Sequence, residues 1–209
     1  MKTVEKMVDK ATLRKALMLA RAQVDPEHKA LWDAAIGAAV IDWWRALGAA
    51  APALLAVYWP LRGEPDLSAA YAELADSGVR LALPVVVGRD AALGFTEWSP
   101  GEAMLADRMG VAVPAALRMR ERPPALLIPC LGFNAQRYRL GYGGGYYDRT
   151  LAAAPRPLTV GVAYACQLAA FAGDPHDVAL DTVITEASRD GAQGPVPRVD
   201  CSGPDQALP

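Results

Sequence analysis

The sequence lacks several features that define large classes of proteins. It contains no uncharged apolar run of about 18 residues, the length needed to cross a membrane. Its N-terminal residues are charged throughout, unlike an apolar secretory signal. The formal net charge of −2 provides no general attraction to nucleic acid or to an anionic membrane. These absences predict a cytoplasmic protein that has neither nucleic acid nor a membrane as a partner.

Cysteine is scarce as well. The 3 cysteines, Cys130, Cys166 and Cys201, are widely and irregularly spaced. This spacing fits neither a disulfide framework nor a C-x-x-C metal site. We therefore expect reduced thiols, with Cys130 as a small core residue, because it lies in an apolar run.

The chain does have enough apolar sequence for a substantial core. Hydrophobic residues make up 53% of its 209 residues and charged residues 21%. These values predict one globular domain, residues 1–189. Residues 190–209 are rich in Gly, Pro, Asp and Gln and have little apolar content, which predicts a disordered tail. We expect a monomer or a weak homo-oligomer.

Hydrophobic periodicity and turn residues predict an α/β fold. Helices are expected at 9–24, with Asp9 as N-cap, from Asp25-Pro26 to Gly48, at 66–77 and at 145–153. The run Ala125–Leu131 is continuously apolar, as in strands covered on both faces. A layered domain with a largely parallel central sheet flanked by helices follows. Its expected strands are 53–59, 79–87, 93–98, 125–131, 158–164 and 182–185.

A glycine-rich turn, residues 139–149, separates a predicted strand from a helix. Glycine occupies positions 141, 143, 144 and 145. Glycines permit positive φ and let backbone amides converge on an anion. The dinucleotide fingerprint and the P-loop both fail at Tyr146. A structural hinge therefore stays an alternative to a phosphate site. Arg139 and Asp148 favour the phosphate site, because they can bind phosphate oxygens and a phosphate-bound metal.

Four ordered motifs make a more specific identification possible. The run 127–149, Leu-Ile-Pro-Cys-Leu-Gly-Phe-Asn-Ala-Gln-Arg-Tyr-Arg-Leu-Gly-Tyr-Gly-Gly-Gly-Tyr-Tyr-Asp-Arg, resembles the signature of the 5-formyltetrahydrofolate cyclo-ligase family. Lys10-Ala-Thr-Leu-Arg14, Pro60-Leu-Arg-Gly-Glu64 and the segment 176–186 resemble further family motifs. The resemblance spans residues 6–187. Asn134 departs from it, since many relatives have aspartate there. The family implies a fold like that of NagB, RpiA and the CoA transferases.

The resemblance also implies roles for particular residues. Phosphate contacts from Arg139 and magnesium binding by Asp148 would be catalytic, with Asp181 as the second magnesium ligand. ATP would be bound by Lys10, Arg14, Arg139, Gly141, Gly143, Gly144, Gly145 and Tyr147. The folate would be bound by Trp59, Glu64, Tyr142, Gly143, Gly144, Gly145 and Tyr146.

Several of these roles have a structural alternative. Asp148 could simply favour the N-terminus of its helix, and Asp181 could merely end a loop. Lys10 and Arg14 lie four residues apart on one helical face, which is also the spacing of a solvated basic stripe. Arg21 continues this stripe, and its role stays open. The two carboxylate oxygens of Glu64 suit the N–H donors of a pterin, although a turn glutamate is ordinarily solvated. Trp59 could equally be a packing residue.

The implied reaction converts 5-formyltetrahydrofolate and ATP into 5,10-methenyltetrahydrofolate, ADP and phosphate, with Mg2+ as cofactor. Phosphorylation of the formyl oxygen would make it a good leaving group. Phosphoryl transfer depends mainly on positioning and charge stabilisation, so no covalent nucleophile is required. A non-catalytic relative that binds a folate or a nucleotide is the alternative.

Overall fold

The computed structural model describes residues 9–107 and 110–188. Within them the α-helices are α1 (Lys10–Ala22), α2 (Pro26–Ala46), α3 (Ser68–Asp76) and α4 (Tyr146–Ala152). Short 3-10 helices occupy Gly48–Ala50 (η1) and Ala165–Gln167 (η2). The tail predicted for 190–209 lies outside the described residues, and the domain boundary at 189 stays a prediction. None of the helices described is long and apolar enough to cross a membrane.

The central sheet of the described residues has seven strands in the order β11-β10-β7-β1-β2-β3-β6. The pairs from β11 to β2 are parallel, whereas β3 and β6 run antiparallel to their neighbours. The prediction of a largely parallel sheet flanked by helices is therefore confirmed. The strands are β1 (Leu54–Ala56), β2 (Arg80–Val86), β3 (Leu93–Trp98), β6 (Met119–Arg120), β7 (Ala125–Pro129), β10 (Leu158–Val162) and β11 (Thr182–Ile184).

Two small hairpin sheets accompany the central one. They pair β4 (Met104–Ala106) with β5 (Ala112–Pro114), and β8 (Gly132–Phe133) with β9 (Arg139–Leu140). These strands and β6 were not expected from the sequence, because two or three residues are too few to show an alternating pattern. The six strands that were expected are all present, and most end one to three residues earlier than predicted.

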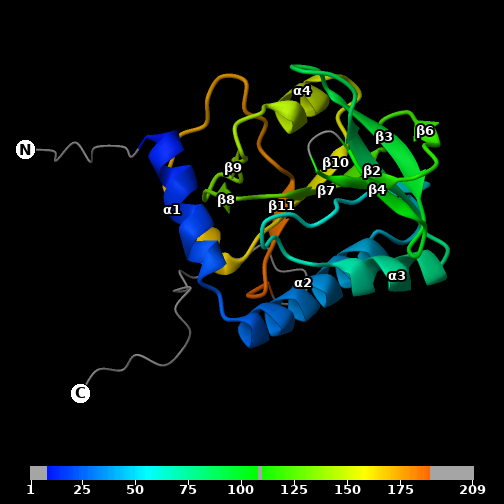
Figure 1. Ribbon diagram of the computed structural model, residues 1–209, viewed down its shortest axis with the longest axis horizontal. Helices are drawn as coiled ribbons and strands as arrows, with labels where there is room; N and C mark the ends of the chain where they lie inside the picture. The colour runs from blue at the N-terminus through cyan, green and yellow to red at the C-terminus, as the bar shows by residue number, and fades with distance from the viewer. Residues whose placement is uncertain (1–8, 108–109, 189–209) are drawn as a thin grey trace, which may run out of the picture.

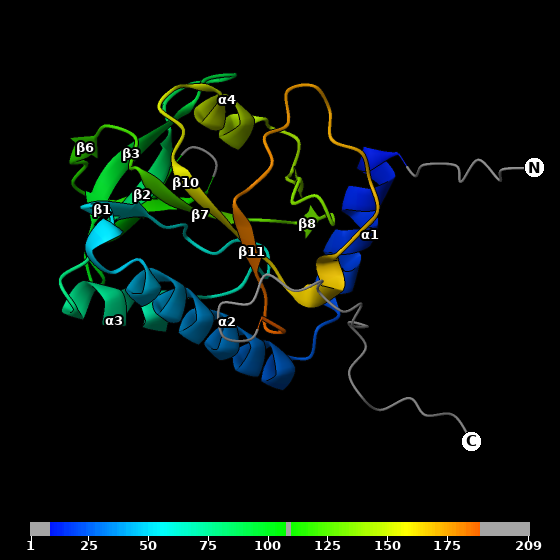
Figure 2. The ribbon, with the colours of Figure 1, turned by 180° about the vertical axis from the view of Figure 1, so that it is seen from behind.

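The helices form layers around the sheet. α2 and α3 lie together against one face, and α4 lies on the opposite side (Figure 1). α1 stands at one end of the molecule beside β8 and β9, in both views (Figure 1 and Figure 2). The end of β7 leads directly into β8. The carboxyl end of the central parallel strands therefore faces α1.

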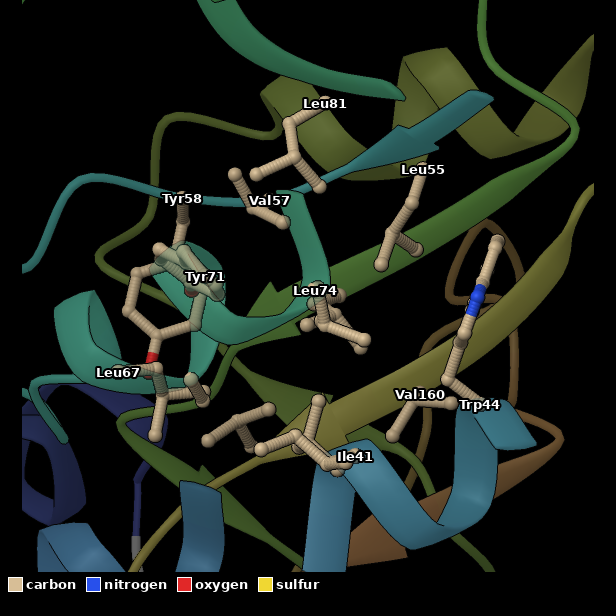
Figure 3. Packing of buried hydrophobic residues seen from close by; sticks show 14 of the residues in the cluster. Ile41, Trp44, Leu55, Val57, Tyr58, Leu67, Tyr71, Leu74, Leu81 and Val160 are labelled. Carbon is tan, nitrogen blue, oxygen red and sulfur yellow. The ribbon is translucent and has the colours of Figure 1, made fainter. Parts of the chain in front are cut away.

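The main core lies between the sheet and the pair α2 and α3. Ile41 and Trp44 of α2 and Leu74 of α3 face Leu55 and Val160 of the sheet (Figure 3). Burial of such side chains is the dominant favourable term in folding. Helix termini are capped as the sequence predicts. The side chain of Asp9 accepts a bond from the amide of Thr12 at 3.0 Å, and that of Asp25 caps α2, which begins with Pro26.

The cysteine prediction is confirmed in part. Cys130 is a free, fully buried thiol in the core between the sheet and α4, and burial raises its pKa to about 12. Cys166 is disulfide-bonded, which corrects the expectation that all the cysteines are reduced. Spacing along the chain does not reveal which thiols folding brings into contact.

Candidate functional site

Loops at the carboxyl end of the parallel strands converge beside α1. Residues 57–67 follow β1, and β8 and β9 follow β7, leading into the glycine-rich turn before α4. Both ribbon views show α1 next to this end of the sheet (Figure 1 and Figure 2). Ligands of open α/β folds bind at this edge, because loops from several strands meet there.

The glycine-rich turn has the backbone geometry that its composition predicts. Gly143 and Gly145 have positive φ angles of 95° and 66°, which side chains disfavour. A Cβ at Gly144 would lie 2.9 Å from the ring of Tyr146, so that position is sterically closed. Gly141 differs from the others, because a Cβ there would meet no heavy atom of the described residues within 4 Å.

Arg14 joins α1 to the glycine-rich turn. Its Nε donates to the carbonyl oxygen of Gly141 at 2.8 Å. A Cβ at Gly143 would lie 3.8 Å from the Arg14 Cζ, so the guanidinium passes close to the turn. The structure therefore brings together two groups that the sequence separately predicts to bind ATP.

Arg139 and Asp148 close the turn with a partly buried ion pair. The Arg139 Nη2 lies 2.6 Å from the Asp148 Oδ1, and the Arg139 side chain is only 5% exposed. The second terminal nitrogen of Arg139 is buried and has no hydrogen-bond partner among the described residues. The Arg139 Cζ lies 5.5 Å from the ring centroid of Tyr147. The predicted catalytic residues are thus neighbours, and the cation retains unused donor capacity.

Glu64, in the loop after β1, and Tyr142, in the glycine-rich turn, form a second cluster. Glu64 is 3% exposed. Its Oε2 accepts from the amide of Leu61 at 2.9 Å and its Oε1 from the hydroxyl of Tyr142 at 2.7 Å. Burial raises the pKa of Glu64, and the bonds from Tyr142 and Leu61 and the charges of Arg21 and Arg62 oppose that shift. Two predicted folate-binding residues are therefore in direct contact.

Arg21, whose role the sequence left open, belongs to this second cluster. It is 3% exposed and donates through Nη2 to the hydroxyl of Tyr142. Its Nε and Nη1 are buried without a partner among the described residues. The basic stripe on α1 is the only sequence signal for this residue, and that stripe is equally typical of a solvated face.

Trp59 and Tyr146, the other aromatic residues predicted to bind folate, have packing partners. The ring of Trp59 meets that of Trp98 edge-on, with centroids 6.1 Å apart. The Arg149 Cζ lies 5.2 Å from the ring centroid of Tyr146. Both rings are partly buried. These contacts explain their orientation, and their role in folate binding stays a prediction.

Lys10 lies on the same face of α1 but contacts a different loop. Its Nζ pairs with the Oδ2 atoms of Asp174 and Asp177 at 2.8 Å and 2.9 Å. Burial tends to raise the pKa of Asp177, but the amide of Asp174 and the charges of Lys10 and Arg139 outweigh it and lower that pKa. Asp177 therefore lies within the electrostatic reach of Lys10 and Arg139, two of the three cations predicted to bind phosphate.

Asp181, the second predicted magnesium ligand, has partners elsewhere. Its Oδ2 accepts from the amide and the hydroxyl of Thr159, both at 2.8 Å, and its Oδ1 pairs with Arg156 at 2.9 Å. These bonds join the starts of β10 and β11. The described residues contain no group of three or more His, Cys, Asp or Glu side chains arranged to hold a metal. Sequence reasoning passed over Asp177, although it stands in the same motif as Asp181.

Asn134, the departure from the family signature, has a structural reason. Its side-chain amide donates to the carbonyl oxygen of Phe171 at 2.8 Å, while its Oδ1 accepts from the amides of Gln136 and Tyr138. An ionised aspartate could accept these two bonds but could not donate the first. Asn134 thus ties the β8–β9 hairpin to the loop that carries Asp174 and Asp177.

The chain is similar to proteins of known function. The chain is 29% identical over 182 residues to the 5-formyltetrahydrofolate cyclo-ligase of Mycoplasma genitalium, covering 85% of this chain and 98% of that protein. A 5,10-methenyltetrahydrofolate synthetase structure from Mycoplasma pneumoniae superposes with a TM-score of 0.72 at 27% identity, covering 86% of this chain and 99% of the other. The Aquifex aeolicus 5,10-methenyltetrahydrofolate synthetase gives a TM-score of 0.70 at 27% identity, with coverages of 90% and 96%.

A model of the 5-formyltetrahydrofolate cyclo-ligase family matches residues 6–186. This range contains the N-terminal basic motif, the turn that carries Glu64, the glycine-rich turn and the segment with Asp177 and Asp181. The chain belongs to the 5-formyltetrahydrofolate cyclo-ligase family and is thus an enzyme of the ligase class.

Proposed function

We propose that the protein cyclises 5-formyltetrahydrofolate to 5,10-methenyltetrahydrofolate at the expense of ATP, with magnesium as cofactor and ADP and phosphate as products. The observation that supports this most directly is that the glycine-rich turn contacts both the predicted phosphate-binding residues and a predicted folate-binding residue. One part of it contacts Arg14 and contains the Arg139–Asp148 pair. Tyr142, in the same turn, bonds to Glu64. A phosphate site and a folate site would therefore adjoin.

The phosphate side consists of cations and backbone amides around the turn. Arg14 and Arg139 can donate to phosphate oxygens, and Arg139 has a buried nitrogen without a partner among the described residues. The amides of Gly141, Gly143, Gly144 and Gly145 and the ring of Tyr147 would complete the ATP site. Lys10 would join it by exchanging its two carboxylate partners for phosphate oxygens.

The carboxylates of the site fit a magnesium ion in part. Asp148 is 28% exposed, so one of its oxygens can reach a cation outside its bond to Arg139. Magnesium is ordinarily held by one or two carboxylates together with substrate phosphates. When bound, it would neutralise charge on the phosphate oxygens. The family resemblance implies Asp181 as the second ligand, whereas contacts with Lys10 favour Asp177.

Glu64 would recognise the folate. Two of the lone-pair sites of its carboxylate accept from Leu61 and Tyr142, which leaves others for two adjacent N–H donors of a pterin. Trp59 and Tyr146 would contact the flat faces of the ligand, with the amides of Gly143, Gly144 and Gly145 close to both substrates. The formyl group would then lie beside the γ-phosphate.

The residues act mainly by positioning. The formyl oxygen attacks the γ-phosphorus and ADP leaves, which converts a poor leaving group into phosphate. The neighbouring folate nitrogen then attacks the activated formyl carbon, which closes the ring. That nitrogen releases its proton to solvent, and departure of phosphate leaves the methenyl carbon doubly bonded to nitrogen. Arg14, Arg139 and Lys10 would stabilise charge on the transferred group, as phosphoryl transfer requires. No protein side chain forms a covalent bond in this scheme.

The direct test mixes purified protein with ATP, magnesium and 5-formyltetrahydrofolate and follows the absorbance of the methenyl product. We expect product only when all three are present. R139A and D148N should lower kcat/KM by about 100-fold or more, because R139A removes a charged contact to the reacting phosphates and D148N removes a ligand of the magnesium ion bound to them. K15M, which removes an exposed charge from the same helix as Arg14, is the matched control. Folded wild-type protein that forms no product would refute the proposal.

Two further outcomes assign details of the site. Folate binding without ATP-dependent turnover would indicate the non-catalytic alternative. A comparison of D177N with D181N identifies the second metal ligand, because only that variant should require a higher magnesium concentration for half-maximal rate. A variant that is less stable but needs no additional magnesium would instead identify a structural aspartate. The bonds of Asp181 to Thr159 and Arg156 predict this outcome for D181N.

A further inference from the structure

Arg21 is a buried cation for which the proposed reaction has no use. It is 3% exposed, yet within the described part of the chain only its Nη2 has a hydrogen-bond partner, the hydroxyl of Tyr142. A buried arginine is costly unless it is paired with a compensating charge. The charge that compensates it is that of Glu64, because the hydroxyl that accepts from Arg21 donates to the Glu64 carboxylate at 2.7 Å.

The direction of this hydrogen-bond chain is determined by chemistry. A guanidinium can only donate, so the hydroxyl oxygen of Tyr142 must accept from Arg21. The single hydrogen of that hydroxyl is then left for Glu64. The amide of Leu61 holds the other carboxylate oxygen at 2.9 Å. With Arg21 in place, each oxygen of the Glu64 carboxylate has a donor, Tyr142 for one and the amide of Leu61 for the other, and these two bonds fix the plane of the group.

We propose that Arg21 is a positioning residue for the folate: acting through Tyr142, it orients the Glu64 carboxylate and keeps it as the anion that accepts the N–H donors of the pterin. This inference rests on the proposed role of Glu64. It gives Tyr142 a task beyond the folate contact that the family resemblance implies. The Arg21 guanidinium would influence folate binding without touching the folate.

The surroundings of Glu64 make it the titrating group of this cluster. The opposite charges near it are Arg21 from α1 and Arg62 from its own loop, and both oppose the rise in pKa that burial causes. The other titratable neighbours are thiol and phenol groups, which are ordinarily protonated near neutral pH, and burial raises the pKa of each further: Tyr58, Tyr71, Cys130, Tyr142 and Tyr147.

The sign of the pH dependence follows. Folate binding requires ionised Glu64, so it is present above the pKa of Glu64 and is lost as the pH falls through it. Removal of the Arg21 charge raises that pKa further. The acid limb of kcat/KM for the folate should therefore move to higher pH in R21M, and also in Y142F, which lacks the bond that lowers this pKa.

The experiment compares R21M, R21K, Y142F and K15M in steady-state kinetics against each substrate. R21M should raise KM for 5-formyltetrahydrofolate about tenfold or more, the usual effect of losing a charged hydrogen bond. KM for ATP should change less than about twofold. R21K keeps the charge, so its acid limb should stay close to that of the wild type. K15M should behave as the wild type in every measurement.

A carboxyl carbon NMR titration of Glu64 in the wild type and R21M provides a readout that needs no turnover. A higher pKa in R21M supports the proposal. An unchanged pKa, or a rise in both KM values without movement of the acid limb, would show that Arg21 is only structural. Wild-type protein without product would contradict the proposed function, while the titration would still decide whether Arg21 controls Glu64.

Discussion

Individual residues of the site are unusual in their burial. Arg21, Glu64 and Arg139 are charged but at most 8% exposed, and charged side chains are rarely so buried without partners. Each has a partner at the site, although Arg21 and Arg139 also retain nitrogens without one among the described residues. Such unpaired buried donors lower the stability of the folded protein, but they can bind acceptor groups of a ligand. At the scale of single residues, the site is therefore arranged for ligands with acceptor groups.

A substitution at Gly141 can distinguish an effect on ATP binding from an effect on stability. An added Cβ there would meet no heavy atom of the described residues within 4 Å, so G141A should alter the free energy of unfolding by less than about 0.5 kcal/mol. If ATP approaches the turn closely, KM for ATP should rise about tenfold or more, since small displacements of reacting groups are costly. Chemical denaturation and steady-state kinetics measure the two effects. An unchanged KM would exclude Gly141 from the ATP site.

G143A is the variant to compare with G141A. The φ of 95° at Gly143 is unfavourable for alanine, so G143A should be destabilised by about 1–3 kcal/mol whether or not ATP binds there. Sequence alone identifies both glycines as candidates. It cannot distinguish them, because the difference lies in backbone torsion and in the space around each Cα.

α1 is the element that connects the parts of the site. Lys10, Arg14 and Arg21 leave it on one face and reach the 171–181 loop, the glycine-rich turn and Tyr142 respectively. Leu17, on the same face, packs in a cluster with Leu131, Leu140 and Phe171. The spacing along the helix could be read from the sequence. Their partners, in the 171–181 loop for Lys10 and in the glycine-rich turn for Arg14 and Arg21, could not, since they depend on where each loop folds.

The ion pair between Lys10 and Asp174 should compete with ATP. Asp174 is 65% exposed, so its pairing is weak. D174N should therefore lower KM for ATP by up to about fivefold, as Lys10 becomes easier to transfer to phosphate. In a K10M background the same substitution should have no effect. A higher KM in D174N, or an equal effect in both backgrounds, would contradict this competition.

Strand β10 depends on a glycine for its packing. A Cβ at Gly161 would lie 2.6 Å from the Leu180 Cδ1 and 3.0 Å from the Cys130 Sγ. G161A should therefore lower the free energy of unfolding by about 1–3 kcal/mol, as overpacking of a core does. Equilibrium denaturation measures this, with G141A as the control for a glycine in open space. Wild-type stability in G161A would mean that Leu180 can move aside.

The whole molecule assembles the site from segments far apart in the chain: α1, the loop after β1, the glycine-rich turn and the 171–181 loop. A ligand that bridges these segments binds only the folded state and must stabilise it. ATP and magnesium at about 100 times Kd should add about 2.7 kcal/mol to the free energy of unfolding. For a chain of this size that raises Tm by about 5–10 °C. R139A should lose the shift in a thermal melt and K15M should keep it. Equal shifts in both would place ATP elsewhere.

Local sequence determined the elements and the identity of the motif residues. Caps such as Asp9 and Asp25 and continuously apolar runs such as Ala125–Leu131 act through neighbouring residues, so they can be read directly. Tertiary structure alone decided the partners: Arg21 with Tyr142 and Glu64, Lys10 with Asp177, and Asp181 with Thr159. These contacts join residues 22 to 167 positions apart. They arise only when the parallel sheet brings its loops to one edge. No local sequence pattern shows which of these distant residues will meet.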